Sequence, residues 1–78
     1  MTLEALRALY LDNLLVEAIV EPCSDNGMWM VEFKHTNDSL IILTDEEGEE
    51  CHYIDSDLAS KSAMEVGFRN VRVESLDL

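Results

Sequence analysis

Two runs of alternating apolar residues flank the dipeptide Asn26-Gly27, and this pattern restricts the fold more than any other feature of the chain. Asn-Gly between such runs is the strongest short signal for a β-hairpin with a two-residue turn. That turn would place Val20 opposite Phe33 in the paired strands. The same register puts Trp29, Val31 and Phe33 on one face, so the turn and the apolar pattern agree. The sequence therefore predicts a hairpin with one face in the core.

The N-terminal segment supplies the elements before this turn. Residues 2–12 predict a helix, because Thr2 suits the N-cap position and Leu, Ala and Arg are good helix formers. Residues 14–22 either prolong the helix or form a strand. Their β-branched residues favour the strand, and at Pro22 this strand should be an edge, because proline lacks an N–H. The apolar face of this strand would hold Val16, Ala18 and Val20.

Two further turns divide the middle of the chain. Asn37-Asp38 predicts a hairpin that places Ile42 opposite Phe33. Gly48 predicts a turn into a strand at residues 51–54. A tight turn there would oppose carboxylates across the two strands, at a cost of roughly 0.2–1 kcal/mol per pair, so we expect a wider loop.

The last part of the chain predicts a helix followed by a short strand. Asp55 or Ser56 can cap a helix that Gly67 ends in a left-handed conformation, and Phe68 would pack back onto its last turn. Residues 70–75 predict the final strand, which follows a helical crossover and can therefore lie parallel to a neighbour. The expected core holds Trp29, Val31, Phe33, Ile42 and Tyr53.

These elements predict one α+β domain that spans residues 1–78. Their order is α-β-β-β-β-α-β, and they form a small, mostly antiparallel sheet with two helices.

Acidic residues outnumber basic ones by seventeen to five, which gives a formal net charge of −12. The five bases are scattered, whereas direct nucleic-acid binding needs clustered Lys and Arg. Attraction to anionic membranes is excluded on the same ground. Two cysteines are too few for a disulfide framework, and the acid-bearing N-terminus lacks the basic region of a signal peptide. We therefore expect a reduced, cytoplasmic protein.

The acidic segment TDEEGEE, residues 44–50, raises the question of a metal site. If Gly48 took the sixth position of an EF-hand calcium loop, Leu43 and Ile54 would take the two anchoring ligand positions, so that motif is excluded. Zinc is the other alternative, but the available ligands contain no compact pair. They are Cys23, His35, Cys51 and His52. We expect no metal and no cofactor.

The sequence contains no arrangement typical of an active site. It has no Gly-x-Ser-x-Gly motif and no glycine-rich phosphate loop, and its three glycines all fall at expected turns or caps. The clustered carboxylates lie in a loop, without the buried surroundings that separate an acid from a base. We therefore expect no catalytic residues and no enzyme activity.

The predicted registers also collect a second apolar group on the opposite face of the sheet. A half-solvated antiparallel strand usually alternates, whereas LIIL at residues 40–43 does not. Either one helix covers each face, or both helices cover one face and leave this group for a partner protein or a second copy of the chain. The candidate partner-binding residues are Met28, Met30, Ile41, Leu43 and Ile54.

The last part of the chain contains five features in succession. They are a D-x-x-G turn, a strand, a capped helix with paired alanines, a Gly-aromatic stop and a V-x-V strand. They lie at residues 45–48, 51–54, 56–66, 67–68 and 71–73. This succession resembles a family of small uncharacterised proteobacterial α+β proteins. The resemblance implies the structure of this part of the chain and no functional residues, because such families have no assigned function.

The sequence supports two functions. The first is a small, acidic, non-enzymatic interaction or accessory protein that binds another protein through the apolar sheet face. The alternative is a DNA mimic that occupies the basic groove of a nucleic-acid-binding protein, with carboxylates in place of phosphates. Outward glutamates of the strands would add to an acidic patch in the loop. The strand glutamates are Glu17, Glu21, Glu32 and Glu74, and the loop acids are Asp45, Glu46, Glu47, Glu49 and Glu50.

Overall fold

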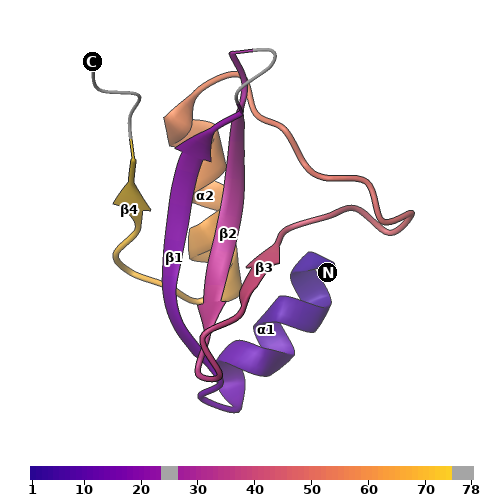
Figure 1. Ribbon diagram of the computed structural model, residues 1–78, viewed down its shortest axis with the longest axis vertical. Helices are drawn as coiled ribbons and strands as arrows, with labels where there is room; N and C mark the ends of the chain where they lie inside the picture. The colour runs from indigo at the N-terminus through magenta and orange to yellow at the C-terminus, as the bar shows by residue number, and fades with distance from the viewer. Residues whose placement is uncertain (24–26, 75–78) are drawn as a thin grey trace.

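The computed structural model describes residues 1–23 and 27–74, which form two helices and one four-stranded sheet (Figure 1). The strand order is β3-β2-β1-β4, with β4 parallel to β1 and the other neighbours antiparallel. The elements are α1 (Leu3–Leu11), β1 (Leu15–Pro22), β2 (Trp29–His35), β3 (Leu40–Ile42), α2 (Ser56–Val66) and β4 (Arg72–Val73). The predicted α+β class and order of elements are confirmed, and the sheet is mixed because the crossover through α2 returns a parallel strand.

α1 forms where its sequence predicts it. The Thr2 side chain accepts a hydrogen bond from the backbone N–H of Ala5 at 3.3 Å and so caps the first turn. Leu6 is fully buried beneath the helix. Asn13 adopts φ +61°, a left-handed conformation that asparagine tolerates. This residue turns the chain directly into β1, so residues 15–22 form a strand and do not prolong the helix.

β1 and β2 form the central hairpin, in a register two residues away from the predicted one. Val20 lies opposite Val31. The backbone N–H of Cys23 donates to the carbonyl of Met28 at 2.7 Å, so the connection is longer than a two-residue turn. Asn26, on which the predicted turn depends, lies outside the described residues. A shift of two residues keeps each side chain on its face, so the predicted core face of β2 is preserved.

A β-bulge near the start of β1 changes the face of one residue. The register shifts between Leu15 and Glu17, which buries Leu15 and leaves Val16 56% exposed. The prediction that Val16 lies in the core beside Ala18 is therefore wrong, because the extra residue breaks the simple alternation of the strand.

The second hairpin forms at the predicted place, with one more residue in its loop. The backbone N–H of His35 donates to the carbonyl of Ser39 at 2.9 Å. Asp38, at φ +72°, takes the left-handed position that ends a three-residue hairpin loop. The Asn37 side chain supports the loop by accepting a hydrogen bond from the backbone N–H of Ser39 at 2.9 Å.

This longer loop shifts the register of β3 by one residue. Phe33 pairs with Ile41, and Ile42 lies opposite Glu32. A shift of one residue moves every side chain of a strand to the other face. The prediction that Ile42 belongs to the core is therefore wrong, and Leu43, only 3% exposed, is in the core instead.

The segment predicted as a strand at residues 51–54 makes a single bridge to the sheet. Tyr53 and Trp29 exchange two backbone hydrogen bonds of 2.8 Å each, in the antiparallel sense. The segment thus keeps its predicted place in the element order, and the side chains of Tyr53 and Trp29 pack against the core.

α2 begins as predicted, at a capping aspartate. The side chain of Asp55 accepts a hydrogen bond from the backbone N–H of Leu58 at 2.8 Å. Ala59, Ala63 and Val66 recur on the buried side of the helix. The small alanines let the helix axis approach the sheet closely.

The end of α2 closes one side of the core. Gly67 adopts φ +142°, and Phe68 packs its ring against those of Tyr10 and Phe33, with centroids 4.8 and 5.8 Å apart. The predicted glycine stop and the inward-packed Phe68 are confirmed. The chain then enters β4, where Arg72 lies beside Ile19 of β1.

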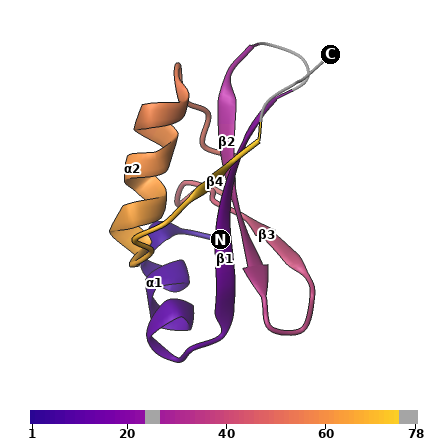
Figure 2. The same cartoon turned by 90° about the vertical axis from the view of Figure 1, so that its left-hand side faces the viewer.

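Both helices pack on the same face of the sheet (Figure 2). The sequence allowed either one helix on each face or both helices on one face, and the second arrangement is the one found. No helix of the described residues covers the other face of the sheet. The core lies between the helices and the sheet. Its buried residues are Leu6, Leu15, Ala18, Val20, Val31, Phe33, Leu43, Ala59, Ala63 and Val66.

Candidate functional site

The face of the sheet away from the helices, here called the open face, mixes carboxylates with apolar side chains. Residues directly opposite each other in neighbouring strands project on the same side, so the strand pairing identifies this face. Glu32 is central to it, because its strand partners are Ile19 on one side and Ile42 on the other. The open face consists of Glu17, Ile19, Glu21, Met30, Glu32, Lys34, Leu40, Ile42, Arg72 and Glu74.

The candidate partner-binding residues do not come together on this face. Of the five, the strand pairing places Met30 there, opposite Glu21. Ile41 and Leu43 lie on the helix-covered face as a result of the one-residue shift in β3. Ile54 is 75% exposed just before the cap of α2, and Met28 is partly buried next to the start of β2. The predicted methionine-rich face is therefore not formed.

Ile19 forms the floor of a shallow hollow in the open face. The hollow has a volume of about 350 Å³ and is bordered by long charged side chains of β1, β2 and β4. Ile19 is only 4% exposed although no helix covers it, because these side chains lie over it. An apolar floor with a charged rim is the form that protein interfaces commonly take.

Burial raises the pKa of Glu32 to about 7. A hydrogen bond with Glu21 adds to this effect, because the protonated Glu32 carboxyl can donate to the Glu21 carboxylate. The negative charges of Glu21, Glu74 and Glu50 raise the pKa further. The pKa of Glu32 thus lies near neutral pH.

Both bases of the open face are paired with other carboxylates. Arg72 is 3.7 Å from Glu17 and 3.5 Å from Glu74, and Lys34 is 3.8 Å from Asp38. Within the described part of the chain, no ion pair involves Glu21 or Glu32. These two carboxylates line the same hollow as Arg72 and Lys34 but have no ion-pair partner among the described residues.

The loop acids lie in a turn that projects away from the sheet, at the right of Figure 1. Asp45 Oδ1 accepts hydrogen bonds from the backbone N–H groups of Glu47 and Glu49, at 2.9 and 3.0 Å. The backbone N–H of Asp45 donates to the carbonyl of Glu49 at 2.8 Å, and Thr44 and Glu50 form an isolated bridge, so the loop has three residues. It is one residue longer than a two-residue turn, but it is closed by pairing and not splayed as expected. Asp45 thus stabilises the turn, and the other loop acids are exposed.

The cysteines and histidines do not assemble a site. Cys51 packs partly buried against the core, and His35 Nδ1 accepts a hydrogen bond from the backbone N–H of Asn37 at 3.1 Å. His52 Nε2 lies 3.3 Å from a carboxylate oxygen of Glu50. Over residues 1–23 and 27–74, no three of the potential metal-ligating side chains come close enough to share an ion.

Sequence reasoning missed the apolar part of the open face. In the sequence, Ile19 lies midway between Glu17 and Glu21 in an alternating strand. This spacing alone places Ile19 on the same outward side as the two glutamates, as the strand pairing shows. Ile42 was assigned to the wrong face by the assumed two-residue turn at Asn37-Asp38.

No protein-family model, curated protein or solved structure matches this chain. The resemblance of residues 45–75 to a proteobacterial family stays a prediction. None of the helices in the described residues is long and apolar enough to cross a membrane.

Proposed function

We propose that this chain is a small, non-enzymatic interaction protein whose open face binds a basic surface of a partner protein. The observation that carries the proposal is the pair Glu21 and Glu32, which has no ion-pair partner among the described residues and lies on the sheet face that neither helix covers. A Lys or Arg of a partner placed between these carboxylates would remove their mutual repulsion and favour the ionised form of Glu32.

The apolar residues of the open face support a protein partner over a simple cation. Met30, Leu40 and Ile42 supply contact area beside the carboxylates, and Leu40 is 56% exposed. A cluster that only attracted ions would not need this apolar surface. Apolar contacts combined with charged groups give both affinity and orientation in protein complexes.

A second copy of the chain is a poorer occupant of the open face. A symmetric dimer through this face would bring Glu21 and Glu32 of one copy against the same carboxylates of the other. Like charges that face each other across an interface are unfavourable, and the chain carries a formal net charge of −12. The proposal therefore names a basic partner and not self-association.

The DNA-mimic alternative makes the basic partner a nucleic-acid-binding protein. The observation that favours it is the origin of the charges around Glu32, which come from Glu21 on β1, Glu74 after β4 and Glu50 at the acidic loop. Carboxylates from separate segments thus adjoin one another across the open face, as mimicry of a phosphate backbone requires.

Affinity capture from a native lysate with matched charge variants tests both ideas. The immobilised bait would be the unsubstituted chain, E21Q/E32Q, or E46Q/E47Q as a control that loses the same two carboxylates in the loop. We expect a basic protein to bind the unsubstituted chain and the control, to be lost with E21Q/E32Q, and to elute with rising salt. Equal capture by E21Q/E32Q would contradict the proposal.

Competition with duplex DNA then separates the two alternatives. Displacement of the captured protein by DNA would favour mimicry, because both ligands would need the same basic groove. Retention of the captured protein in excess DNA would favour an interaction protein of the first kind.

A further inference from the structure

β3 is an edge strand of the sheet, and part of its outward backbone has no partner (Figure 1). The carbonyl of Ser39 and the backbone N–H of Leu43 both bond to β2. Because hydrogen-bonding positions alternate along an antiparallel strand, Leu40 and Ile42 direct their N–H and C=O groups away from β2. The edge of the sheet therefore presents a row of backbone donors and acceptors.

Met1 closes one end of this edge. Its amino group donates to the carbonyl of Ile42 at 3.2 Å, and its carbonyl accepts a hydrogen bond from the backbone N–H of Thr44 at 2.8 Å. The outer side of β3 thus already pairs with a second stretch of backbone at that end. Within residues 1–23 and 27–74, no backbone partner lies against the N–H of Ile42 or the N–H and C=O of Leu40. These three groups remain available to a further strand.

The sequence of β3 does not protect this edge. Exposed edge strands usually carry a charge, a proline or a bulge that blocks pairing with another chain. Residues 39–44, SLIILT, contain neither a charge nor a proline, and the register of β3 against β2 shows no shift. Leu40, in the free part of the edge, is 56% exposed. The edge is therefore suited to accept a strand from another chain.

Carboxylates surround the free part of the edge. Asp38 precedes β3, with 88% of its side chain exposed, and the acidic loop at residues 45–50 follows β3. Glu32 lies one strand further in, opposite Ile42. The lysine of β2, Lys34, is already paired with Asp38 at 3.8 Å. A strand that pairs here is therefore favoured if it carries positive charge.

We propose that a basic partner protein binds by adding an extended segment to β3 as a fifth strand of the sheet. The inference rests on the function proposed for the open face, and it specifies how the partner is held. Residues of the added strand opposite Leu40 and Ile42 would project on the open face. A Lys at these positions can lay its aliphatic stem over the two apolar side chains and extend its charge toward Glu32. Backbone hydrogen bonds would supply affinity, and the basic side chains would supply specificity.

A second copy of the chain fits this edge less well. Pairing of two β3 edges would bring together two chains that each carry a formal net charge of −12. In an antiparallel pair, the acidic loop of each copy would lie toward the Asp38 end of the other. Like charges that meet across an interface are unfavourable, and a basic strand avoids this repulsion.

A ¹⁵N NMR titration with the end-blocked pentapeptide Lys-Val-Lys-Val-Lys tests the proposal, because its lysines share one side of an extended strand. We expect saturable shifts centred on the amides of residues 38–42, and slower hydrogen exchange at the amides of Leu40 and Ile42. The same peptide with every backbone N–H methylated keeps its charges and side chains but has no backbone donor. It should bind roughly tenfold more weakly. Glu-Val-Glu-Val-Glu should not bind, and the absence of saturable binding by the lysine peptide would overturn the proposal.

Leu40→Pro removes one outward donor from the chain itself. It leaves the bonds between β3 and β2 in place, because the N–H of Leu40 does not face β2. It should weaken binding of the lysine peptide roughly tenfold. Leu40→Ala is the matched control, which loses the side chain but keeps the N–H, and it should bind more tightly than Leu40→Pro. The dispersion of each spectrum reports whether the variant is folded, and hydrogen exchange in the unsubstituted chain tests the pairing without any variant.

E21Q/E32Q separates a failure of this inference from a failure of the proposed function. Weakening by E21Q/E32Q, with equal binding of the methylated peptide and unchanged exchange at Leu40 and Ile42, would overturn strand addition and leave the open face as the binding site. Weakening by Leu40→Pro and by methylation, with no effect of E21Q/E32Q, would support strand addition and contradict the function proposed for the open face. Association of the chain alone in light scattering, abolished by Leu40→Pro, would assign the edge to a second copy and overturn the proposal.

Discussion

Gly67 lies against the ring of Tyr10, so that the ends of α1 and α2 meet with no room for a side chain between them. A Cβ at position 67 would overlap the Tyr10 ring, and φ of +142° is a conformation that residues other than glycine rarely adopt. We expect Gly67→Ala to lower the free energy of unfolding by roughly 2 kcal/mol or more, measured by urea denaturation.

Gly48→Ala is the matched control for this substitution. Gly48 also has a positive φ, of +88°, but a Cβ there has nothing within 4 Å. Its cost should be limited to the backbone conformation, about 1 kcal/mol. Equal losses for the two variants would mean that the helix ends do not meet as closely as described.

The one-residue register of β3 can be tested by truncating neighbouring residues. Leu43 is buried in the core, whereas Ile42 lies on the open face opposite Glu32. Leu43→Ala should therefore cost roughly 2–5 kcal/mol in the free energy of unfolding, and Ile42→Ala clearly less. Phe33→Ala, at the fully buried centre of β2, should cost roughly 3–5 kcal/mol and provides the reference for a core position. If Ile42→Ala were the more damaging of the two β3 variants, the register would be the one predicted from a two-residue turn.

The sequence predicted the helices well because their signals are local. Thr2, Asp55 and Gly67 act within one turn of the helix ends, and each has the role that its residue type predicts. Registers depend on loop length, which residue types limit only loosely. The left-handed Asp38 lengthened the second loop by one residue, and that single step moved Ile41, Ile42 and Leu43 to the opposite faces.

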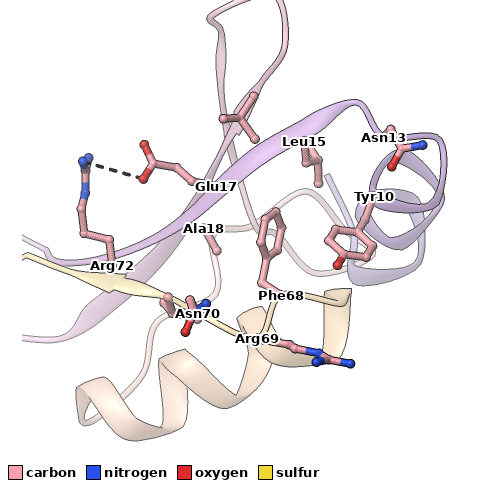
Figure 3. Close-up of a pocket in the computed structure, with 11 residues that line it drawn as sticks. Tyr10, Asn13, Leu15, Glu17, Ala18, Phe68, Arg69, Asn70 and Arg72 are labelled. Atoms are coloured by element: carbon pink, nitrogen blue, oxygen red, sulfur yellow. Dashed lines mark ion pairs between the residues drawn. The ribbon is translucent and has the colours of Figure 1, made fainter.

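The candidate site was less predictable than the fold for the same reason. The outward glutamates of β1 and β2 followed from alternation, but the apolar residues between them depended on the register of β3. The cleft between β1 and the connection from α2 to β4 (Figure 3) left no signal in the sequence, since it arises where this connection diverges from β1 in space.

The raised pKa of Glu32 predicts how stability changes with pH. Its folded-state pKa of about 7 lies above the ordinary glutamate value of 4.5, so the folded chain binds this proton more tightly than the unfolded chain. The contribution of Glu32 to stability is fully present below pH 4.5 and is lost as the pH rises toward and through 7. Glu32→Gln should remove this loss, so that the variant gains stability over the unsubstituted chain as the pH rises.

Urea denaturation at several pH values between 4.5 and 8 measures this difference. The comparison of variant with unsubstituted chain cancels the titration of other groups. Glu47→Gln, which removes one exposed carboxylate from the loop, is the control and should show no such rise across this window. A constant difference between Glu32→Gln and the unsubstituted chain would show that Glu32 ionises as an ordinary surface carboxylate.

The acidic loop should respond differently to the loss of Asp45 and to the loss of its other carboxylates. Asp45 accepts two backbone hydrogen bonds, so Asp45→Ala leaves two N–H donors without their partner and should cost roughly 1–2 kcal/mol in the free energy of unfolding. The exposed acids repel one another across a Debye length of roughly 8 Å at physiological salt, and among them only Glu50 has a partner in the described residues, His52 at 3.3 Å. E46Q/E47Q/E49Q/E50Q should therefore keep the fold and be slightly more stable at low salt, with the gain disappearing at high salt.

Calorimetric titration with calcium should show no saturable tight binding, because Asp45 is directed at the backbone. Stoichiometric binding that the quadruple variant abolishes would make the loop a metal site and contradict this account.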